Sequence, residues 1–217
     1  MTTHLQMELD HVKERVFEMA DRSAESIERA ITALKELDHA AAAKIIERDS
    51  VIDALEKEID DECVRLLVTR QPAASDLRFV LAMLKINTDL ERIGDLSVNI
   101  ARETQNLCGK PLIKPLIDIP RMAAISVEML KSTLAAIITL DSNAAKAVIA
   151  RDREIDDLNK QLFRELFTIM MENPSLLSQA FSLIIIARLL ERIGDHVTNI
   201  AERVVYLVEG VDIRHSS

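Results

Sequence analysis

Apolar residues recur three and four positions apart along most of the chain. Between positions 183 and 207 this alternation continues for more than three heptads, through Leu183, Ile186, Leu190, Ile193, Val197, Ile200, Val204 and Leu207. A matching series of equivalent positions begins at Met83 and ends at Leu107. A seam with this period is typical of long helices that pack in a bundle.

Capping and breaking residues divide the chain into six predicted helices. We expect them over residues 4–37, 38–70, 75–107, 120–140, 141–172 and 175–209. Asp38 is suited to the N-cap of the second helix, because its carboxylate can accept hydrogen bonds from free backbone amides. Pro72 and Pro174 end the helices that precede them, and prolines at positions 111, 115 and 120 forbid a continuous helix there.

The chain contains an internal repeat. The block ERIGD at Glu91–Asp95 recurs as Glu191–Asp195, and the residues Asn-Ile-Ala follow each copy after three positions, at an offset of 100. Upstream, residues 38–53 match residues 141–156 at an offset of 103. The sequence therefore predicts an all-α fold of two tandem three-helix bundles related by duplication, residues 1–108 and 120–217, joined by the proline-rich linker 109–119.

Composition and charge exclude several classes of protein. Only 3% of the residues are aromatic and four are glycine, which argues against an all-β fold. The net charge of −9 has the wrong sign for a nucleic-acid partner. Cys63 and Cys108 form no CxxC pair, the first residues do not resemble a signal peptide, and the longest apolar run is five residues, 183–187. We therefore expect a cytoplasmic protein without a membrane span of its own.

Each half carries two pairs of acidic residues spaced four apart. The pairs are Asp49 with Asp53, Glu91 with Asp95, Asp152 with Asp156, and Glu191 with Asp195. On a helix the two members of a pair lie on one side and repel each other unless a counter-charge intervenes. The helical period places Glu91, Asp95 and Asn99 on one stripe opposite the apolar seam. Glu191, Asp195 and Asn199 form the same stripe, whereas the other two pairs lie on the shoulder of the seam.

Two interpretations of these acidic pairs remain open. The first is a solvated surface with local salt bridges, because Arg48, Arg92, Arg151 and Arg192 each adjoin an acid. The second is a metal site, since the acids persist in both halves while surface residues around them change. Carboxylate and carboxamide oxygens favour hard cations such as Mg²⁺, Mn²⁺ or Ca²⁺, and also suit iron. All eight acids are candidate metal ligands, and Asn99 and Asn199 are further candidates.

Gly94 and Gly194 lie inside the repeated blocks. A glycine within a helix costs about 1 kcal/mol relative to alanine, so each position requires a reason. One reason is close contact between two helices, and the other is room for a metal, water or ligand beside the carboxylates. His196 is expected to stand alone at the surface.

No arrangement of residues typical of an enzyme is present. Two Glu-x-x-His spacings, Glu8 to His11 and Glu36 to His39, resemble di-iron motifs, but one lies near the N-terminus and the other at a helix junction. A phosphate-binding loop, a dinucleotide-binding turn, a zinc-protease motif and a nucleophile elbow are all missing from the sequence. We therefore expect a protein without catalytic residues.

The repeated ERIGD blocks, the segment RQPAASDLR at Arg70–Arg78 and the two RDxxID blocks together resemble the PhoU family of phosphate-transport regulators. The resemblance extends over residues 7–215. It implies tandem three-helix bundles, a homodimer, and E/D-xxx-D motifs that bind clusters of metal ions such as Mg, Mn, Fe or Zn. The triplet DLR at Asp76–Arg78 is missing from the second half, so a role of that segment is not expected to be duplicated.

The resemblance also implies a function. It is that of a non-enzymatic, cytoplasmic, negative regulator of phosphate uptake and phosphate-starvation signalling. The implied partners are the ATPase of the phosphate ABC transporter and the phosphate-response sensor histidine kinase, and contact with the membrane occurs only through them. The alternative is a carboxylate-bridged helical-bundle protein with metal storage or redox activity. A purely structural coiled coil fits poorly, because prolines interrupt its heptads.

Overall fold

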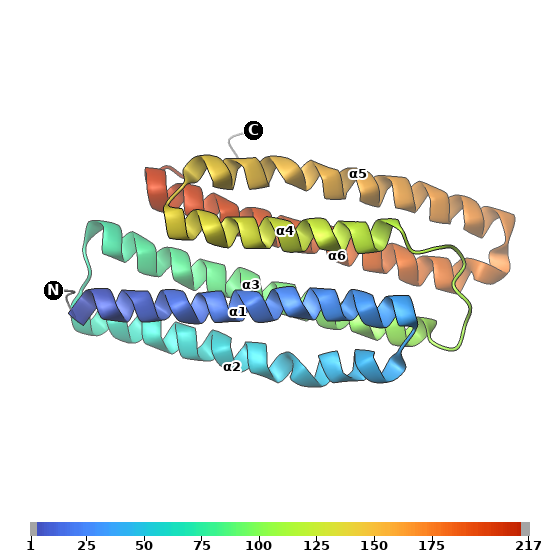
Figure 1. Ribbon diagram of the computed structural model, residues 1–217, viewed down its shortest axis with the longest axis horizontal. Coiled ribbons are helices and arrows are strands. Elements are labelled where there is room, and N and C mark those ends of the chain that lie inside the picture. Colours follow the sequence, from blue (N-terminus) through green and yellow to red (C-terminus); the bar gives the residue numbers. More distant parts are fainter. Residues whose placement is uncertain (1–3, 214–217) are drawn as a thin grey trace.

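The structure, a computed structural model, describes residues 4–213 and contains only helices within that range (Figure 1). The elements in chain order are α1 (His4–Glu36), α2 (His39–Arg70), α3 (Ala74–Leu107), α4 (Asp118–Thr139), α5 (Ser142–Glu172), the short 3₁₀ helix η1 (Pro174–Leu176) and α6 (Leu177–Glu209). The predicted all-α fold is confirmed, and the predicted ends of the long helices lie within three residues of those observed.

The turns that follow α1 and α4 have the same design. Leu37 and Leu140 both adopt left-handed backbone conformations, with φ of 49° and 51°. The next residue in each turn, Asp38 or Asp141, caps the following helix. Each carboxylate accepts hydrogen bonds from two backbone amides, at 2.9 and 3.0 Å. The duplication therefore extends to the geometry of the turns, and the predicted cap at Asp38 is confirmed.

Helix α4 is shorter than its counterpart α1, with 22 residues against 33. It begins at Asp118, two residues before the predicted start. Pro120 lies in the first turn, where backbone N–H groups have no partner within the helix, so the N–H that proline lacks costs no hydrogen bond. At the offset of 103, residues 5–14 of α1 have no helical counterpart. The linker occupies these positions of the sequence instead, and it contacts the second half of the chain. Gln179 of α6 donates a hydrogen bond to the carbonyl of Pro111 at 2.7 Å, and Lys114 pairs with Glu165 of α5.

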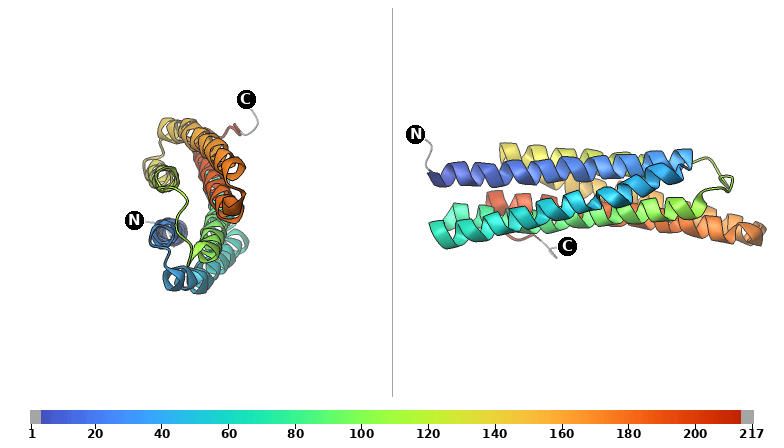
Figure 2. Two further views of the ribbon diagram at one scale, coloured as in Figure 1. Left: turned by 90° about the vertical axis from the view of Figure 1, so that its right-hand side faces the viewer. Right: turned by 90° about the horizontal axis from the view of Figure 1, so that it is seen from below.

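Each half is a three-helix bundle, and the two halves pack side by side. Helix α3 lies along α6 and α1 lies along α4, so α1 and α4 occupy one side of the molecule and α3 and α6 the other (Figure 2). The halves run in opposite directions, which places the α2–α3 turn and the α5–α6 turn at opposite ends (Figure 1). A single apolar core extends through both halves, and the seam residues from Leu183 to Val204 are buried in it.

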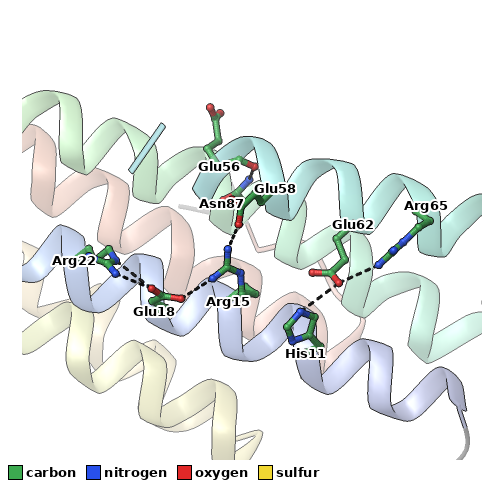
Figure 3. Close-up of polar contacts among 9 residues, drawn as sticks. All are labelled: His11, Arg15, Glu18, Arg22, Glu56, Glu58, Glu62, Arg65 and Asn87. Carbon is green, nitrogen blue, oxygen red and sulfur yellow. Dashed lines mark hydrogen bonds and ion pairs between the residues drawn. The ribbon is translucent and has the colours of Figure 1, made fainter. Parts of the chain in front are cut away.

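Charged and polar contacts connect the helices of the first half (Figure 3). Arg15 of α1 pairs with Glu58 of α2, and His11 lies 3.5 Å from Glu62. The buried side chain of Asn87 on α3 donates two hydrogen bonds of 2.9 Å to α2, to the carbonyl of Glu56 and the carboxylate of Asp60. Exposed ion pairs contribute at most about 1 kcal/mol each. The apolar core therefore provides most of the stability, while the two buried hydrogen bonds of Asn87 set the position of α3 relative to α2.

Within the described residues, one helix, α4, is long and apolar enough to cross a membrane by length and composition. Its mean hydropathy over an 18-residue window is 1.4, and 56% of that window is buried inside the protein. Buried residues such as Met122, Met129 and Leu130 account for this hydropathy, because α4 packs against α1, α5 and α6. The hydropathy of α4 is therefore that of a helix that packs in the core of a bundle.

Candidate functional site

The four acidic pairs form two clusters, one in each half. In the first cluster Asp49 and Asp53 of α2 face Glu91 and Asp95 of α3, because these two helices pack side by side. The second cluster repeats the arrangement on α5 and α6, with Asp152, Asp156, Glu191 and Asp195. Seven of the eight residues are half-buried and Asp195 is exposed. The predicted position of the α3 and α6 stripes, opposite the packed face, is therefore wrong, because a neighbouring helix lies beside each stripe.

Two carboxylates of the first cluster, Asp49 and Glu91, have raised pKa values. Burial raises the pKa of Asp49, and the nearby charges of Asp53 and Asp95 raise it further. Burial also raises the pKa of Glu91, with a second contribution from Asp95. Arg92 offsets part of this repulsion, since its guanidinium lies 3.4 Å from Glu91 and 3.3 Å from Asp95. The predicted local salt bridge is thus present at Arg92.

In the second cluster, Asp152 is the acid with the least compensating positive charge. Burial raises the pKa of Asp152 to about 6, and the charges of Asp195, Asp156 and Glu191 contribute in that order. Burial likewise raises the pKa of both Glu191 and Asp195. Arg151 adjoins Asp152 in sequence but pairs with other residues, Glu128 of α4 at 3.1 Å and Glu154 at 3.4 Å. The salt-bridge interpretation therefore does not explain Asp152.

The two helical glycines let an acidic side chain of the neighbouring helix lie against the ERIGD helix. A Cβ atom at Gly194 would lie 2.7 Å from Oδ1 of Asp152 and 3.0 Å from Cδ1 of Ile155. At Gly94 the equivalent atom would lie 3.0 Å from Cδ1 of Ile52 and 3.8 Å from Oδ1 of Asp49. Close helix contact therefore accounts for both glycines, and at Gly194 the contacting atom is itself a carboxylate oxygen.

The asparagine and histidine of the repeated blocks have other partners. Asn99 accepts a hydrogen bond from Arg102 at 2.8 Å. Asn199 donates one to Asp89 at 3.3 Å, and Nδ1 of His196 lies 2.9 Å from the same Asp89 oxygen. The side chains of His196 and Asp89 are only 19% and 14% exposed. The expectation that His196 stands alone at the surface is wrong, because α3 packs along α6 and brings Asp89 from the other half.

The donor set of each cluster consists of oxygens, which suits a hard cation. Within residues 4–213, however, no group of three or more His, Cys, Asp or Glu side chains is arranged to hold a metal ion. Each helix contributes two carboxylates whose mutual repulsion a cation would relieve. Metal binding by the eight acids thus fits the chemistry of the residues and stays a prediction.

The raised pKa of Asp152 predicts how stability depends on pH in metal-free protein. An acid with a higher pKa in the folded state binds its proton more tightly there, so its contribution to stability is present below the unfolded pKa and is lost as the pH rises through about 6. After allowance for partial exposure, we expect Asp152→Asn to raise the free energy of unfolding at pH 7.5 by on the order of 1 kcal/mol.

Urea unfolding followed by circular dichroism at pH 4.5 and pH 7.5, in the presence of a chelator, measures this effect. Asp61→Asn is the control, since it removes one exposed charge from α2. If Asp152→Asn gains no more stability at pH 7.5 than the control does, the second cluster is not the source of repulsion that we describe.

Comparison with known proteins gives consistent results for the whole chain. The family model described as the PhoU domain matches twice, over residues 16–104 and 119–204. A protein of Pseudomonas putida named phosphate-specific transport system accessory protein PhoU homolog is 40% identical over 209 residues, which cover 96% of this chain and 82% of that protein. A relative of the same name from Aquifex aeolicus is 39% identical and covers 96% of this chain and 94% of that protein.

Two crystal structures share the fold. That of PhoU from Pseudomonas aeruginosa has a TM-score of 0.92 at 37% identity, and the match covers 96% of this chain and 100% of that chain. That of the phosphate transport system regulatory protein PhoU from Streptococcus pneumoniae has a TM-score of 0.90 at 29% identity, with coverage of 96% and 99%. Both bundles of the chain are therefore present in these proteins.

Proposed function

From the membership of this chain in the PhoU family, we propose that it is a non-enzymatic regulator of phosphate uptake that acts by contact with other proteins. The observation that carries the proposal is the match of both halves to PhoU domains, together with relatives named as accessory proteins of phosphate-specific transport. The sequence contains no motif typical of an enzyme in addition to this match. The two similar bundles present two similar surfaces, and such surfaces suit a protein that connects two partners.

The proposed action is negative and takes place in the cytoplasm. The partners are the ATPase of the phosphate ABC transporter and the phosphate-response sensor histidine kinase, and the protein acts as a homodimer that reaches the membrane through them. When phosphate is plentiful, the protein binds the inactive state of the kinase more tightly than the active state. This difference in affinity shifts the population of the kinase towards its inactive state.

Deletion of the gene tests this proposal. We expect deletion to raise expression of phosphate-starvation genes in phosphate-rich medium, and a plasmid copy of the wild-type gene to restore repression. Copies with alanine at both ERIGD blocks should repress more weakly than the wild type. Expression that stays low after deletion would contradict the regulatory role, and metal storage or redox activity would become the function to assay.

The proposal includes divalent or transition metal ions at the two acidic clusters. Burial first, and the charges of neighbouring acids second, raise the pKa values of Asp49, Asp152 and Glu191, and this supports the proposal because a bound cation would offset both effects. A metal ion there would supply positive charge that joins α2 to α3 and α5 to α6. Partial exposure leaves room for water to compete, so the affinity should be modest.

We expect the double variant Asp95→Ala with Asp195→Ala to lose its bound Mn²⁺, because it removes one carboxylate from each cluster. Elemental analysis of protein dialysed against Mn²⁺ measures the metal content, and circular dichroism checks that the helices remain. The control is Asp61→Ala with Asp157→Ala, which removes two exposed acids outside the eight candidates. Equal metal content in both double variants would refute the assignment.

A further inference from the structure

A groove lies between the first two helices, along the half of each helix that adjoins the α1–α2 turn. Its volume is about 640 Å³, and its lining residues fall within positions 22–33 of α1 and 41–52 of α2. Small-molecule sites in proteins usually have volumes of roughly 300–1,000 Å³. The groove therefore has the size of a site for a small organic ligand.

Basic side chains line both walls of this groove. Arg22 and Arg29 come from α1, and Lys44 and Arg48 come from α2. The protein as a whole carries a net charge of −9, so four cations around one groove differ from its general charge. A cleft lined by one sign of charge attracts ligands of the opposite sign. The groove therefore favours an anion.

Several donors of the groove are available to a ligand. Among residues 4–213, neither Lys44 nor Arg48 forms a hydrogen bond or an ion pair. The half-buried Ser26, which also lines the groove, has a hydroxyl group without a partner in the same range. Ammonium, guanidinium and hydroxyl groups all donate hydrogen bonds to anionic oxygens.

The other two cations are held by exposed ion pairs along α1. Arg22 donates a hydrogen bond of 2.8 Å to Glu18, as Figure 3 shows, and Arg29 pairs with Glu25. The two arginine side chains are 45% and 44% exposed, so solvent weakens both pairs. A phosphate group can compete for such a guanidinium, because it accepts two parallel hydrogen bonds from it. Glu25 and Asp49 are the two acids in the lining, so the cations outnumber the acids.

The second half of the chain does not repeat the basic lining. At the offset of 103, uncharged residues replace three of the four cations: Arg22, Arg29 and Lys44 correspond to Ile125, Ser132 and Ala147. The fourth, Arg48, corresponds to Arg151, which pairs with Glu128 and Glu154. The acidic clusters occur in both halves and the basic groove in one, so the three-helix bundle itself does not require these cations.

The spacing of the cations and the apolar lining indicate the class of anion. Arg22 and Arg29 lie seven residues apart on α1, which is about 10 Å along the helix. A single phosphate group is too small to contact both, whereas a chain of two or three phosphates reaches from one to the other. The lining also includes Ala33, Ala41 and Ile45, which offer apolar surface to the rest of a ligand.

We propose that this groove binds an organic anion with two or three phosphate groups, the class to which nucleoside diphosphates and triphosphates belong. The phosphates contact the four cations and the hydroxyl of Ser26, and the organic part lies against the apolar residues of the lining. This inference goes beyond the proposed function and does not rest on it, since it concerns a small molecule bound by the chain alone.

Calorimetric titration of the full chain with ATP and with ADP tests the proposal. The buffer contains a chelator, so that no metal ion at the acidic clusters attracts the phosphates. We expect one site per chain that takes both nucleotides, with an affinity that falls as salt is added, because salt screens the exposed charges. Adenosine, which has no phosphate group, should not bind.

Variants that copy the second half test the residues of the groove. Arg29→Ser with Lys44→Ala should weaken ATP binding at least tenfold, because it removes two charged donors. The control is Arg164→Ser with Lys57→Ala, which removes the same two side chains at exposed positions outside the groove and should bind within twofold of the wild type. Ser26→Met introduces the residue found at position 129 and fills the groove without changing its charge, so it should also weaken binding at least tenfold. Circular dichroism confirms that each variant is folded.

Several outcomes would overturn the proposal. The first two are no binding of ATP, and equal binding by the groove variants and the control. Loss of binding in the double groove variant but not in Ser26→Met would show a general effect of charge. Orthophosphate or pyrophosphate that binds as tightly as ATP would show an inorganic anion, and equal competition by citrate would show that any polyanion binds. Co-sedimentation with phosphatidylglycerol vesicles that the groove variants abolish and ATP does not inhibit would show a lipid headgroup instead.

Discussion

Ile193→Ala is expected to lower the free energy of unfolding by roughly 3 kcal/mol, the usual loss when a fully buried isoleucine is truncated. Ile193 has no exposed surface, and its helix α6 packs against α3, α4 and α5. The truncation therefore leaves a cavity in a part of the core that cannot collapse easily. Chemical unfolding in urea, followed by circular dichroism, measures the loss.

The control for this prediction is Ile138→Ala, the same truncation at a side chain that is 62% exposed. We expect the control to change stability by less than about 1 kcal/mol.

Because α3 and α6 pack together in a single core, both halves should also unfold in one transition, and Ile193→Ala should shift that whole transition to lower urea concentration. Two separate transitions, with only one of them shifted, would show that the halves are independent domains.

Gly194→Leu is expected to lower the free energy of unfolding by about 2–3 kcal/mol, because it forces extra volume into a close helix contact. A Cβ atom at this position already meets Oδ1 of Asp152 at 2.7 Å and Cδ1 of Ile155 at 3.0 Å, so a longer side chain must push α5 away from α6. The measurement is again urea unfolding, here of metal-free protein so that ligand binding does not contribute.

Ser178→Leu is the control for Gly194→Leu, since it places the same side chain at an exposed, uncharged position of the same helix. Its effect should stay within about 0.5 kcal/mol. Gly94→Ala and Gly194→Ala form a second comparison, because only at Gly194 does the new methyl group displace a carboxylate. If Gly194→Leu is no more destabilising than the control, the close approach of α5 to α6 is not essential for stability.

Much of the fold follows from local sequence signals. The seam from Leu183 to Val204 predicts a buried face of α6, and the structure buries it. Asp38 caps α2 because the carboxylate of a residue at this position reaches amides only two and three residues away. The left-handed Gly109 follows the end of α3, and the prolines of the linker then prevent a continuous helix, because a proline ring fixes φ and removes a donor. None of these effects needs a residue from a distant part of the chain.

The candidate site was only partly predictable. Helical spacing correctly pairs Glu91 with Asp95 and Asp49 with Asp53, since neighbours at i and i+4 are fixed by the helix itself. The spacing gives no information on which helix lies beside each pair. It therefore places Glu91 opposite the packed face, whereas α3 has neighbours on several sides and even Leu96 and Val98 are buried.

The sequence by itself determined the helices, their turns, the duplication and the composition of each acidic pair, because these depend on residues within a few positions or on self-similarity. Only the tertiary structure decided which pairs form a cluster, that His196 contacts Asp89 of the other half, and that the α2–α3 and α5–α6 turns lie at opposite ends. These features depend on how α3 packs against α6 and α2 against α3. Such packing depends on the total burial of side chains that are far apart in the chain, and a local sequence pattern does not predict this total.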